Sequence, residues 1–407
     1  MKDFLQLMEE GDKLESSLGQ MTRGISNFNE KLVRFIELIA NKPGYSSNKR
    51  NYLLKEAETT TDFPFLFGTV LERQLYVKYK AAEPDWRTYI KTGTQNDFRP
   101  AWLIGVFGLT GGLQQVQQRG EYKQDAVLAD GKVAIALSKF GREFPLAWES
   151  LINDDLGAFS DVADRFALAA LRTEYRQATL LYAGAAGPHA ALYGSALAHP
   201  IDGIAINNKF SSGNQLPVVD PSTGVQSNVT PIFNINNLAG AASVLRRFTD
   251  ADGEPVIFDG FELVVPPRLE VAMLQALNPA NVIMSAGDAT AGTKPVIRSS
   301  SNTVPQLNIT GHVNPYLPIV DQSGNADKTW YLFGKLTNAG YAARLNFLRG
   351  HESPEICMKN PDKLTIGGQQ VSAMEGDYSS DSVRWRVRHV LGGTQVDPRY
   401  TAAFIGA

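Results

Sequence analysis

The most constraining feature of the sequence is a long polar stretch between two short segments of alternating large and small residues, all within residues 98–146. A period of two is typical of β-strands, and it marks Trp102, Ile104 and Val106, then Val133, Ile135 and Leu137. The segment between them reads GLTGGLQQVQQRGEYKQDAVLADG. The pattern predicts a long β-hairpin with a tip too polar to be buried. Such a stretch is typical of a functional extension or a disordered loop.

The strongest helical pattern covers residues 160–183. We expect Ser160 to cap its start, Asp161 and Asp164 to favour the positive end of the helix dipole, and Gly184 to end it. Its apolar residues form two rows, Val162, Phe166, Ala169 and Ala170, and then Leu168, Leu171, Tyr175, Ala178 and Tyr182. At 1.5 Å per residue, the predicted helix is about 36 Å long, which is long for a small domain.

The N-terminal residues 1–56 are charged and helical in pattern. Residues 28–40 have one apolar stripe, and Asn27 with Glu30 forms a capping-box pattern before it. This helix is either an arm packed on its own subunit or an arm packed on a neighbour. We expect the segment to stay on in the mature protein, because its apolar stripe must be covered. A second helix is predicted over residues 62–82.

Beyond residue 184 the pattern alternates between short elements. Residues 184–233 are rich in Gly, Pro, Asn and Ser, which predicts mostly loop. Helices are predicted over 238–248 and from Pro267 to Leu277, after a buried strand at 261–265 that Pro266 and Pro267 break. Residues 285–294 are predicted to be loop. Further strands are predicted at 329–333, 355–358 and 383–390, the last with strict alternation.

Charge and cysteine content exclude several classes of protein. The 407 residues include 39 Lys plus Arg and 42 Asp plus Glu, a formal net charge of −3. A dedicated nucleic-acid binder would carry a marked basic excess. Cys357 is the only cysteine, so no intrachain disulfide can form, as expected for folding in a reducing cytoplasm. The sequence contains no run of 18 apolar residues, so it predicts no membrane span.

No catalytic pattern stands out. The five histidines lack metal-ligand spacing, and residues 287–294 depart from a phosphate-binding loop because Thr293 and Lys294 are reversed. Asp154 and Asp155 precede a helix, so we interpret them as capping or turn residues. His351 beside Glu352 is interpreted as surface chemistry. We therefore expect no enzymatic activity, no metal and no cofactor.

Three arginines lie on one face of the strand predicted at 383–390: Arg384, Arg386 and Arg388. Guanidinium groups bind phosphate or carboxylate in a bidentate geometry. On a nearly neutral protein, we expect these arginines to meet carboxylates of an adjoining surface. They are therefore candidates for salt bridges between subunits.

Four segments carry a family resemblance, in the same order as in the family. They are TTTDFPFLFGTVLERQLYVKYKAAEPDWRTY (59–89), KFGREFPLAWESLINDDLGAFSDVADRFALAALRTEYRQATLLYAG (139–184), FELVVPPRLEVAMLQAL (261–277), and NPYLPIVD with TWYLFG (314–334). The set, which extends over residues 59–405, resembles the major capsid proteins of tailed bacteriophages, with the fold named after phage Hong Kong 97. It is most similar to the Mu-like major head subunit group.

The resemblance implies an α+β fold, the Hong Kong 97-like capsid fold. Its expected parts are an N-terminal arm, an extended loop, a peripheral domain with a long spine helix, and an axial domain. The arm would be 1–58 and the extended loop 98–145. The peripheral domain would be 59–97, 146–233 and 344–390, and the axial domain 234–343 and 391–407.

The function that the resemblance implies is structural. Pentamers and hexamers of the chain would form the icosahedral head that encloses the double-stranded DNA of a tailed phage, without sequence-specific binding. The protein would be assembled in the bacterial cytoplasm, would reside in the virion, and would contact no membrane. The alternative is the shell of an encapsulin-like cellular compartment.

Further partners follow from the same resemblance. A portal protein and decoration proteins are expected partners, and either a separate scaffold protein exists or none is needed, because only about 58 residues precede the match. The expected contacts between subunits in the extended loop are Arg119, Glu121, Lys123 and Asp125. We expect no covalent link between subunits, with Cys357 buried in its strand.

Overall fold

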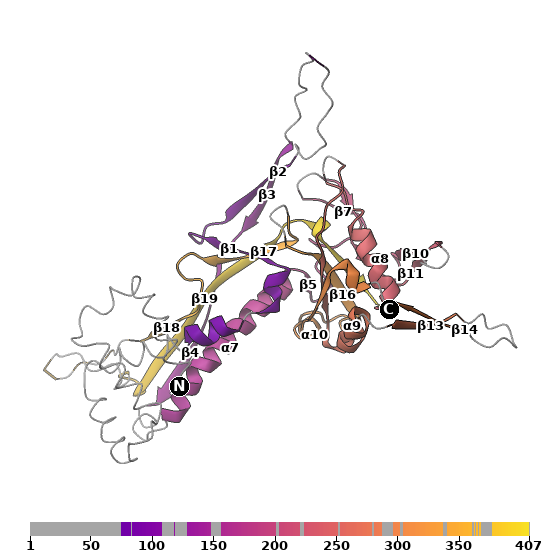
Figure 1. Cartoon of the computed structure of the whole chain (residues 1–407). Helices are drawn as coiled ribbons and strands as arrows, with labels where there is room; N and C mark the ends of the chain where they lie inside the picture. Colours follow the sequence, from indigo (N-terminus) through magenta and orange to yellow (C-terminus); the bar gives the residue numbers. More distant parts are fainter. Residues whose placement is uncertain are drawn as a thin grey trace. The chain divides into compact units, whose positions relative to one another are not determined.

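The computed structural model describes residues 75–406, with gaps at 83, 108–117, 119–127, 148–155, 201–202, 220–223, 251–252, 279–280, 287–295, 302–303, 337–339, 360–361, 363, 365 and 368–376 (Figure 1). The chain divides into two compact units. Unit 1 comprises Met1–Glu83, Lys139–Arg172 and Gly350–Val390, and unit 2 comprises Pro84–Ser138, Thr173–Arg349 and Leu391–Ala407. The predictions for residues 1–74, including the helix at 28–40, lie outside the described residues.

A five-stranded mixed sheet forms the centre of unit 2, in the order β15-β12-β16-β20-β9. Its strands are β9 (Lys209–Phe210), β12 (Phe261–Val265), β15 (Ile309–Val313), β16 (Thr329–Gly334) and β20 (Thr401–Ile405). Every residue of β12 and β16 is buried. Strands covered on both faces appear in sequence as continuous apolar runs. The predictions for 261–265 and 329–333 are therefore confirmed.

One face of this sheet packs against helices α8 (Ile235–Leu245) and α9 (Glu270–Leu277) (Figure 1). Trp330 stacks on Phe404 with ring centroids 4.1 Å apart. Helix α8 begins three residues before the predicted start, because the Asn234 side chain accepts a hydrogen bond from the Asn237 amide. The proline pair after β12 leads into η2 (Pro267–Leu269) and then α9, as predicted.

The other face of the sheet is lined by buried tyrosines. Tyr182, after the end of α7, makes edge-to-face contacts with Tyr331 and Phe333 of β16. Its hydroxyl lies 2.5 Å from the Asn314 amide nitrogen. Burial raises the pKa of Tyr182 to about 12, so the phenol stays neutral, and its oxygen accepts the hydrogen bond from the Asn314 amide.

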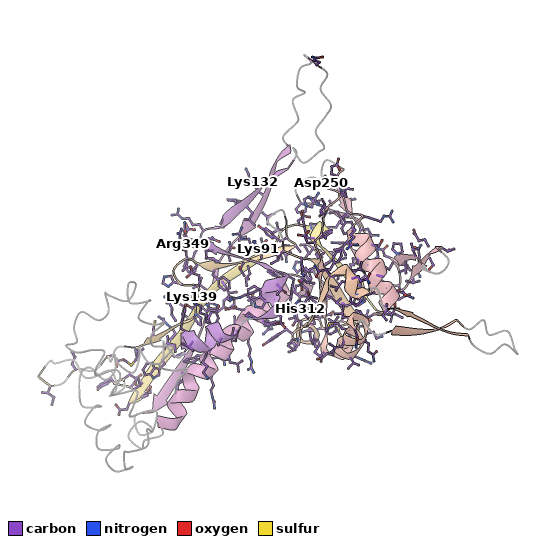
Figure 2. All side chains as sticks on the ribbon, in the orientation of Figure 1. Lys91, Lys132, Lys139, Asp250, His312 and Arg349 are labelled. Atoms are coloured by element: carbon purple, nitrogen blue, oxygen red, sulfur yellow. The ribbon has the colours of Figure 1, made fainter. Side chains whose placement is uncertain are left out.

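A carboxylate and a histidine share this face. Glu262 of β12 is buried, and its Oε2 lies 2.6 Å from Nε2 of His312 on β15. His312, labelled in Figure 2, also lies 3.2 Å from the hydroxyl of Thr88, the last residue of η1 (Asp85–Thr88). A buried carboxylate needs such partners, because losing hydration is costly.

A second buried polar cluster connects distant parts of unit 2. Asp397 contacts Nε of Arg399 at 3.1 Å and Nε2 of His199 at 3.2 Å, and all three side chains are at most 10% exposed. The Asn208 amide donates to the carbonyls of Leu192, Pro398 and Thr401. The cluster thus ties the segment before β9 to η5 (Pro398–Tyr400) and β20.

Residues 184–233 are mostly irregular, as predicted, but the segment is interrupted by short strands. The segment contains short antiparallel pairs, which are too brief to show a sequence period. They are β5 (Ala183–Gly184) with β6 (Gly187–Pro188), β7 (Leu197–Ala198) with β8 (Ala205–Ile206), and β10 (Leu216–Val219) with β11 (Gln226–Val229). Residues Ser285 and Ala286, also predicted as loop, end strand β13 (Asn281–Ala286), which pairs with β14 (Val296–Ser301).

The remaining elements of unit 2 are short. Strand β1 (Lys91–Gln95) pairs in parallel with β17 (Ala343–Leu348), which pairs with the C-terminal part of β19 (Ser382–Gln395). Strands β2 (Ala101–Phe107) and β3 (Leu128–Ile135) form a two-stranded ribbon. The short helices η3 (Val304–Leu307) and α10 (Leu317–Val320) complete the unit.

Unit 1 contains a helix over residues 75–81, strand β18 (Glu355–Met358) and the first part of β19. It also contains strand β4 (Ser138–Ala147) except for its first residue, Ser138. Both β4 and β18 pair with β19. Strand β18 matches its prediction. Cys357, however, is only partly buried, because β18 lies at an edge of its sheet. The expectation of a buried thiol is therefore wrong.

Helix α7 (Leu156–Leu180) confirms the long predicted helix but shifts its ends. Ser160 lies inside the helix and does not cap it, and the helix ends before Gly184, which pairs in β5. Phe166, Ala170 and Ala178 are buried as predicted, whereas Leu168 is 46% exposed. Among the described helices, none is long and apolar enough to cross a membrane.

The Asp397 cluster generates a prediction on stability and pH. Burial alone would raise the pKa of Asp397, but the hydrogen bond from His199 and the charge of Arg399 outweigh it and lower the pKa. Asp397→Asn should reduce the free energy of unfolding at pH 7 by roughly 3 kcal/mol, because Arg399 loses its buried counter-charge. Urea unfolding monitored by tryptophan fluorescence measures this difference.

The pH dependence has a defined sign. A lowered pKa stabilises the fold above the unfolded value of about 3.9, and this contribution is lost as the pH falls through the folded value. The difference between wild type and Asp397→Asn should therefore shrink below about pH 4. Asp327→Asn is the control, since its carboxylate is half exposed, lies 3.7 Å from Arg268, and should contribute less than about 1 kcal/mol. Equal losses in the two variants would contradict the prediction.

Candidate assembly surface

The ribbon of β2 and β3 confirms the predicted antiparallel pairing of the hairpin. Ala101 pairs with Ile135 and Phe107 with Leu128, with a register shift at Gly105 and Val106. Strand β3 ends at Ile135, and the next strand, β4, pairs with β19 instead of β2. The predicted second strand, which included Leu137, was therefore placed too far along the chain.

This ribbon has little cover of its own. Among the described strands, none pairs with β2 or β3 on their outer edges. Trp102 on β2 is 60% exposed, and Phe98 just before it is 51% exposed. A two-stranded ribbon is marginally stable alone in water, and exposed aromatic side chains are common at protein interfaces. The ribbon is therefore a candidate contact between subunits.

The four loop residues expected to contact a neighbour, Arg119, Glu121, Lys123 and Asp125, lie outside the described residues. The first described charged side chain after this segment of the sequence is Lys132 on β3, which is exposed and labelled in Figure 2. Asp154, Asp155 and the loop 287–294 also lie outside the described residues.

Strand β19 presents the three arginines on one face, as its alternation predicts. Val383, Trp385, Val387 and His389 are buried, whereas Arg384 and Arg388 are partly exposed and Arg386 is exposed. Val390 is buried as well, so the alternation predicted over residues 383–390 ends at His389. His389 contacts the ring of Tyr79, from the helix over residues 75–81.

Arg384 pairs with carboxylates of its own chain. Its guanidinium lies 3.4 Å from Glu143 of β4 and 3.1 Å from Asp377. Asp377 also accepts hydrogen bonds from the hydroxyl of Ser380 and the amide of Ser382. The hydrogen bond from Ser380, followed by the Ser382 amide and the charge of Arg384, holds the pKa of Asp377 well below its usual value, so this carboxylate stays ionised.

Arg388 also has a carboxylate partner in its own chain. Glu355 on β18 contacts both Arg388 and His351. Burial acts to raise the pKa of Glu355, but the hydrogen bonds from His351 and Arg388 outweigh it and hold the pKa below its usual value. His351 therefore pairs with Glu355, and its sequence neighbour Glu352 accepts a hydrogen bond from the Gly350 amide instead.

Arg386 differs from its two neighbours. It is exposed, and among the residues that the structure describes no carboxylate lies within ion-pair distance of it. Sequence periodicity placed the three arginines together but could not distinguish them, because Glu143 is 241 residues from Arg384 along the chain. The outward arginine is therefore the one available to a second molecule.

The described residues show no constellation typical of catalysis. Within them, no group of three or more His, Cys, Asp or Glu side chains could hold a metal ion. A cavity of about 310 Å³ lies in unit 2 between the start of α8 and α9, and its lining residues are Phe233, Asn234, Ile235, Asn236, Ala272, Gln275 and Ala276. None of these side chains titrates in the physiological range, so the cavity offers shape and amide groups but no acid or base.

A family model matches most of the chain. The family model described as "Phage capsid protein" matches residues 131–404. No curated protein matches the chain. The capsid of the cyanophage P-SCSP1u aligns over 80% of this chain and 88% of its own, with 10% identity and a TM-score of 0.45.

Two further solved structures are similar to the chain. The mature capsid of bacteriophage PhiM1 covers 80% of this chain and 87% of its own, at 11% identity and a TM-score of 0.42. A virus-like particle from Pyrococcus furiosus covers 83% and 99%, at 10% identity and a TM-score of 0.40. The assignment therefore rests on the family model, which spans most of the chain and both units. The chain belongs to the phage capsid protein family.

Proposed function

We propose that this chain is the major capsid protein of a tailed bacteriophage, with the Hong Kong 97-like fold and closest to the Mu-like major head subunit group. Pentamers and hexamers of it form the icosahedral head around a double-stranded DNA genome. The role is structural, and the protein resides in the virion after assembly in the host cytoplasm. The single observation that carries this proposal is the family match over residues 131–404, which includes most of β3 and all of α7, β12 and β19.

The domain layout expected from the sequence belongs to this proposal. The layout comprises an arm, an extended loop that includes β2 and β3, a peripheral domain that contains α7 and most of β19, and an axial domain that contains β12 and β16. Portal, scaffold and decoration proteins are partners within the same proposal. The family match favours a phage head over the encapsulin-like alternative.

Two described surfaces support a role in assembly. The ribbon of β2 and β3 exposes Trp102 and has no third strand among the described residues. Arg386 presents a guanidinium outward next to two arginines that are already paired. A closed shell requires several contacts per subunit, and such surfaces can supply them.

Assembly itself is the first prediction. Purified chain, supplied with its scaffold where one is needed, should form closed shells visible by electron microscopy and by size-exclusion chromatography with light scattering. Particles from infected cells should contain double-stranded DNA. A monodisperse monomer or dimer under assembly conditions would overturn the proposal, and shells that hold an enzyme in place of DNA would favour the cellular compartment.

The extended loop provides a second prediction. Deleting residues 112–126 and closing with a short turn should leave the subunit folded, with an unchanged helical signal by circular dichroism, but unable to form stable shells. Ordering the loop costs about 1–2 kcal/mol per residue, so its contact must bury area along the strands and not only at a few charges. A control loop of equal length made of Gly and Ser separates the loss of contacts from the loss of length. Heat-stable shells from both variants would contradict the prediction.

The arginine face provides a third prediction. Arg386→Glu should change the free energy of unfolding by less than about 0.5 kcal/mol, because the side chain is exposed. It should nevertheless slow assembly, most at low salt, where charges are screened least. Light scattering measures assembly and urea unfolding measures stability.

Arg384→Glu is the matched contrast. It would bring a third carboxylate beside Glu143 and Asp377, so it should lower the stability of the subunit itself. Equal effects of the two substitutions on stability, with no difference in assembly, would show that Arg386 is not a contact between subunits.

A further inference from the structure

The exposed side of helix α7 carries arginines that no carboxylate described in unit 1 neutralises. Arg165 and Arg172 are exposed, and Leu168 between them is 46% exposed. Seven residues correspond to 700° of helical rotation, so the two arginines lie within about 20° of one another around the axis and about 10 Å apart along it. The row continues to Arg176, also exposed, one turn further along the same helix.

The guanidinium groups of Arg165 and Arg172 differ from those of several other arginines in having no described carboxylate partner. Arg87, Arg384, Arg388 and Arg399 each have a carboxylate partner. For Arg165 and Arg172, no carboxylate among the described residues lies within ion-pair distance. Helix α7 therefore offers a row of positive charge with one exposed leucine in it.

The start of the chain has the complementary chemistry. Residues 3–15, DFLQLMEEGDKLE, contain five carboxylates and one lysine, a net charge of −4. The segment also contains four leucine and methionine side chains and one phenylalanine: Phe4, Leu5, Leu7, Met8 and Leu14. A segment of this kind can pair with arginines and cover an exposed leucine at the same time.

We propose that residues 3–15 dock on the exposed face of α7 in their own subunit, with their carboxylates against Arg165 and Arg172 and their apolar side chains over Leu168. The chain enters the described part of unit 1 at the helix over 75–81, and 59 residues separate that helix from Glu15. Even as one continuous helix these residues would span about 90 Å, so reach does not limit the contact. Tethering also raises the effective concentration of the segment at α7 above that of any free partner.

Thiol accessibility tests the proposal without assuming a register. Ala169 lies between Arg165 and Arg172 on the same side of the helix. In a Cys357→Ser background, Ala169→Cys is alkylated by N-ethylmaleimide, and the rate is measured on the unassembled full-length subunit. We expect deletion of residues 2–15 to accelerate alkylation at least fivefold, and Arg165→Glu with Arg172→Glu to do the same.

A charge exchange identifies the partner. Glu9→Lys, Glu10→Lys and Asp12→Lys combined with the two arginine reversals should restore slow alkylation, which a change in helix stability alone would not do. Lys139→Cys on exposed β4 is the matched control, and its rate should not respond to the deletion. Arg247→Glu, an exposed arginine on unit 2, should leave the rate at Ala169→Cys unchanged.

Three outcomes would overturn the proposal. Fast alkylation in the full chain that the deletion leaves unchanged means that the segment does not cover α7. Protection that disappears on dilution means that a second copy supplies the cover. If random-sequence duplex DNA, and not residues 3–15, slows alkylation in a salt-dependent manner, the arginines bind phosphate instead. The experiment uses free subunits, so none of these results decides whether the chain forms a capsid.

Discussion

The position of the last strand, β20, is the constraint on which unit 2 depends. Strand β20 lies between β16 and β9, so the sheet cannot close until the end of the chain has reached residues about 190 positions earlier. The buried contacts of Asp397 with Arg399 and His199, and of Asn208 with three carbonyls, fix this strand on both sides. Contacts between residues so far apart in sequence carry a high loop-closure entropy. Strand β20 joins the sheet along β16, every residue of which is buried.

Elements with an uninterrupted physical period could be predicted from the sequence. Strand β12 and the alternating half of β19 follow their patterns, because burial on both faces or on one face leaves a direct mark on residue type. The errors lie where geometry is set by distant partners. Helix α7 begins at Leu156, ahead of the predicted start at Ser160, and the two-residue strands after α7 are too short to show a period. Cys357 is apolar in pattern but lies on an edge strand.

The candidate contacts show the same division. Periodicity gathered Arg384, Arg386 and Arg388 on one face, yet two of them satisfy carboxylates that the fold brings from β4, β18 and the Asp377 turn. A sequence records which face a charge occupies but not whether another part of the chain neutralises it. Only the three-dimensional arrangement leaves Arg386 as the unpaired member within the described residues. The same reasoning separates Arg165 and Arg172 from Arg87, whose partner is the buried Glu174.

A near-neutral chain can therefore carry strong local charge without a basic excess. Fixed ion pairs inside each unit, such as Asp397 with Arg399, contribute to the stability of one subunit and are insensitive to neighbours. Exposed unpaired arginines contribute little to that stability, and each exposed pair that they form contributes about 1 kcal/mol or less. A single contact of this strength breaks and re-forms readily, and only many contacts together hold subunits in place. This reversibility allows a large assembly to correct misplaced subunits. The aromatic side chains on the β2–β3 ribbon would then supply the buried area that charges alone cannot.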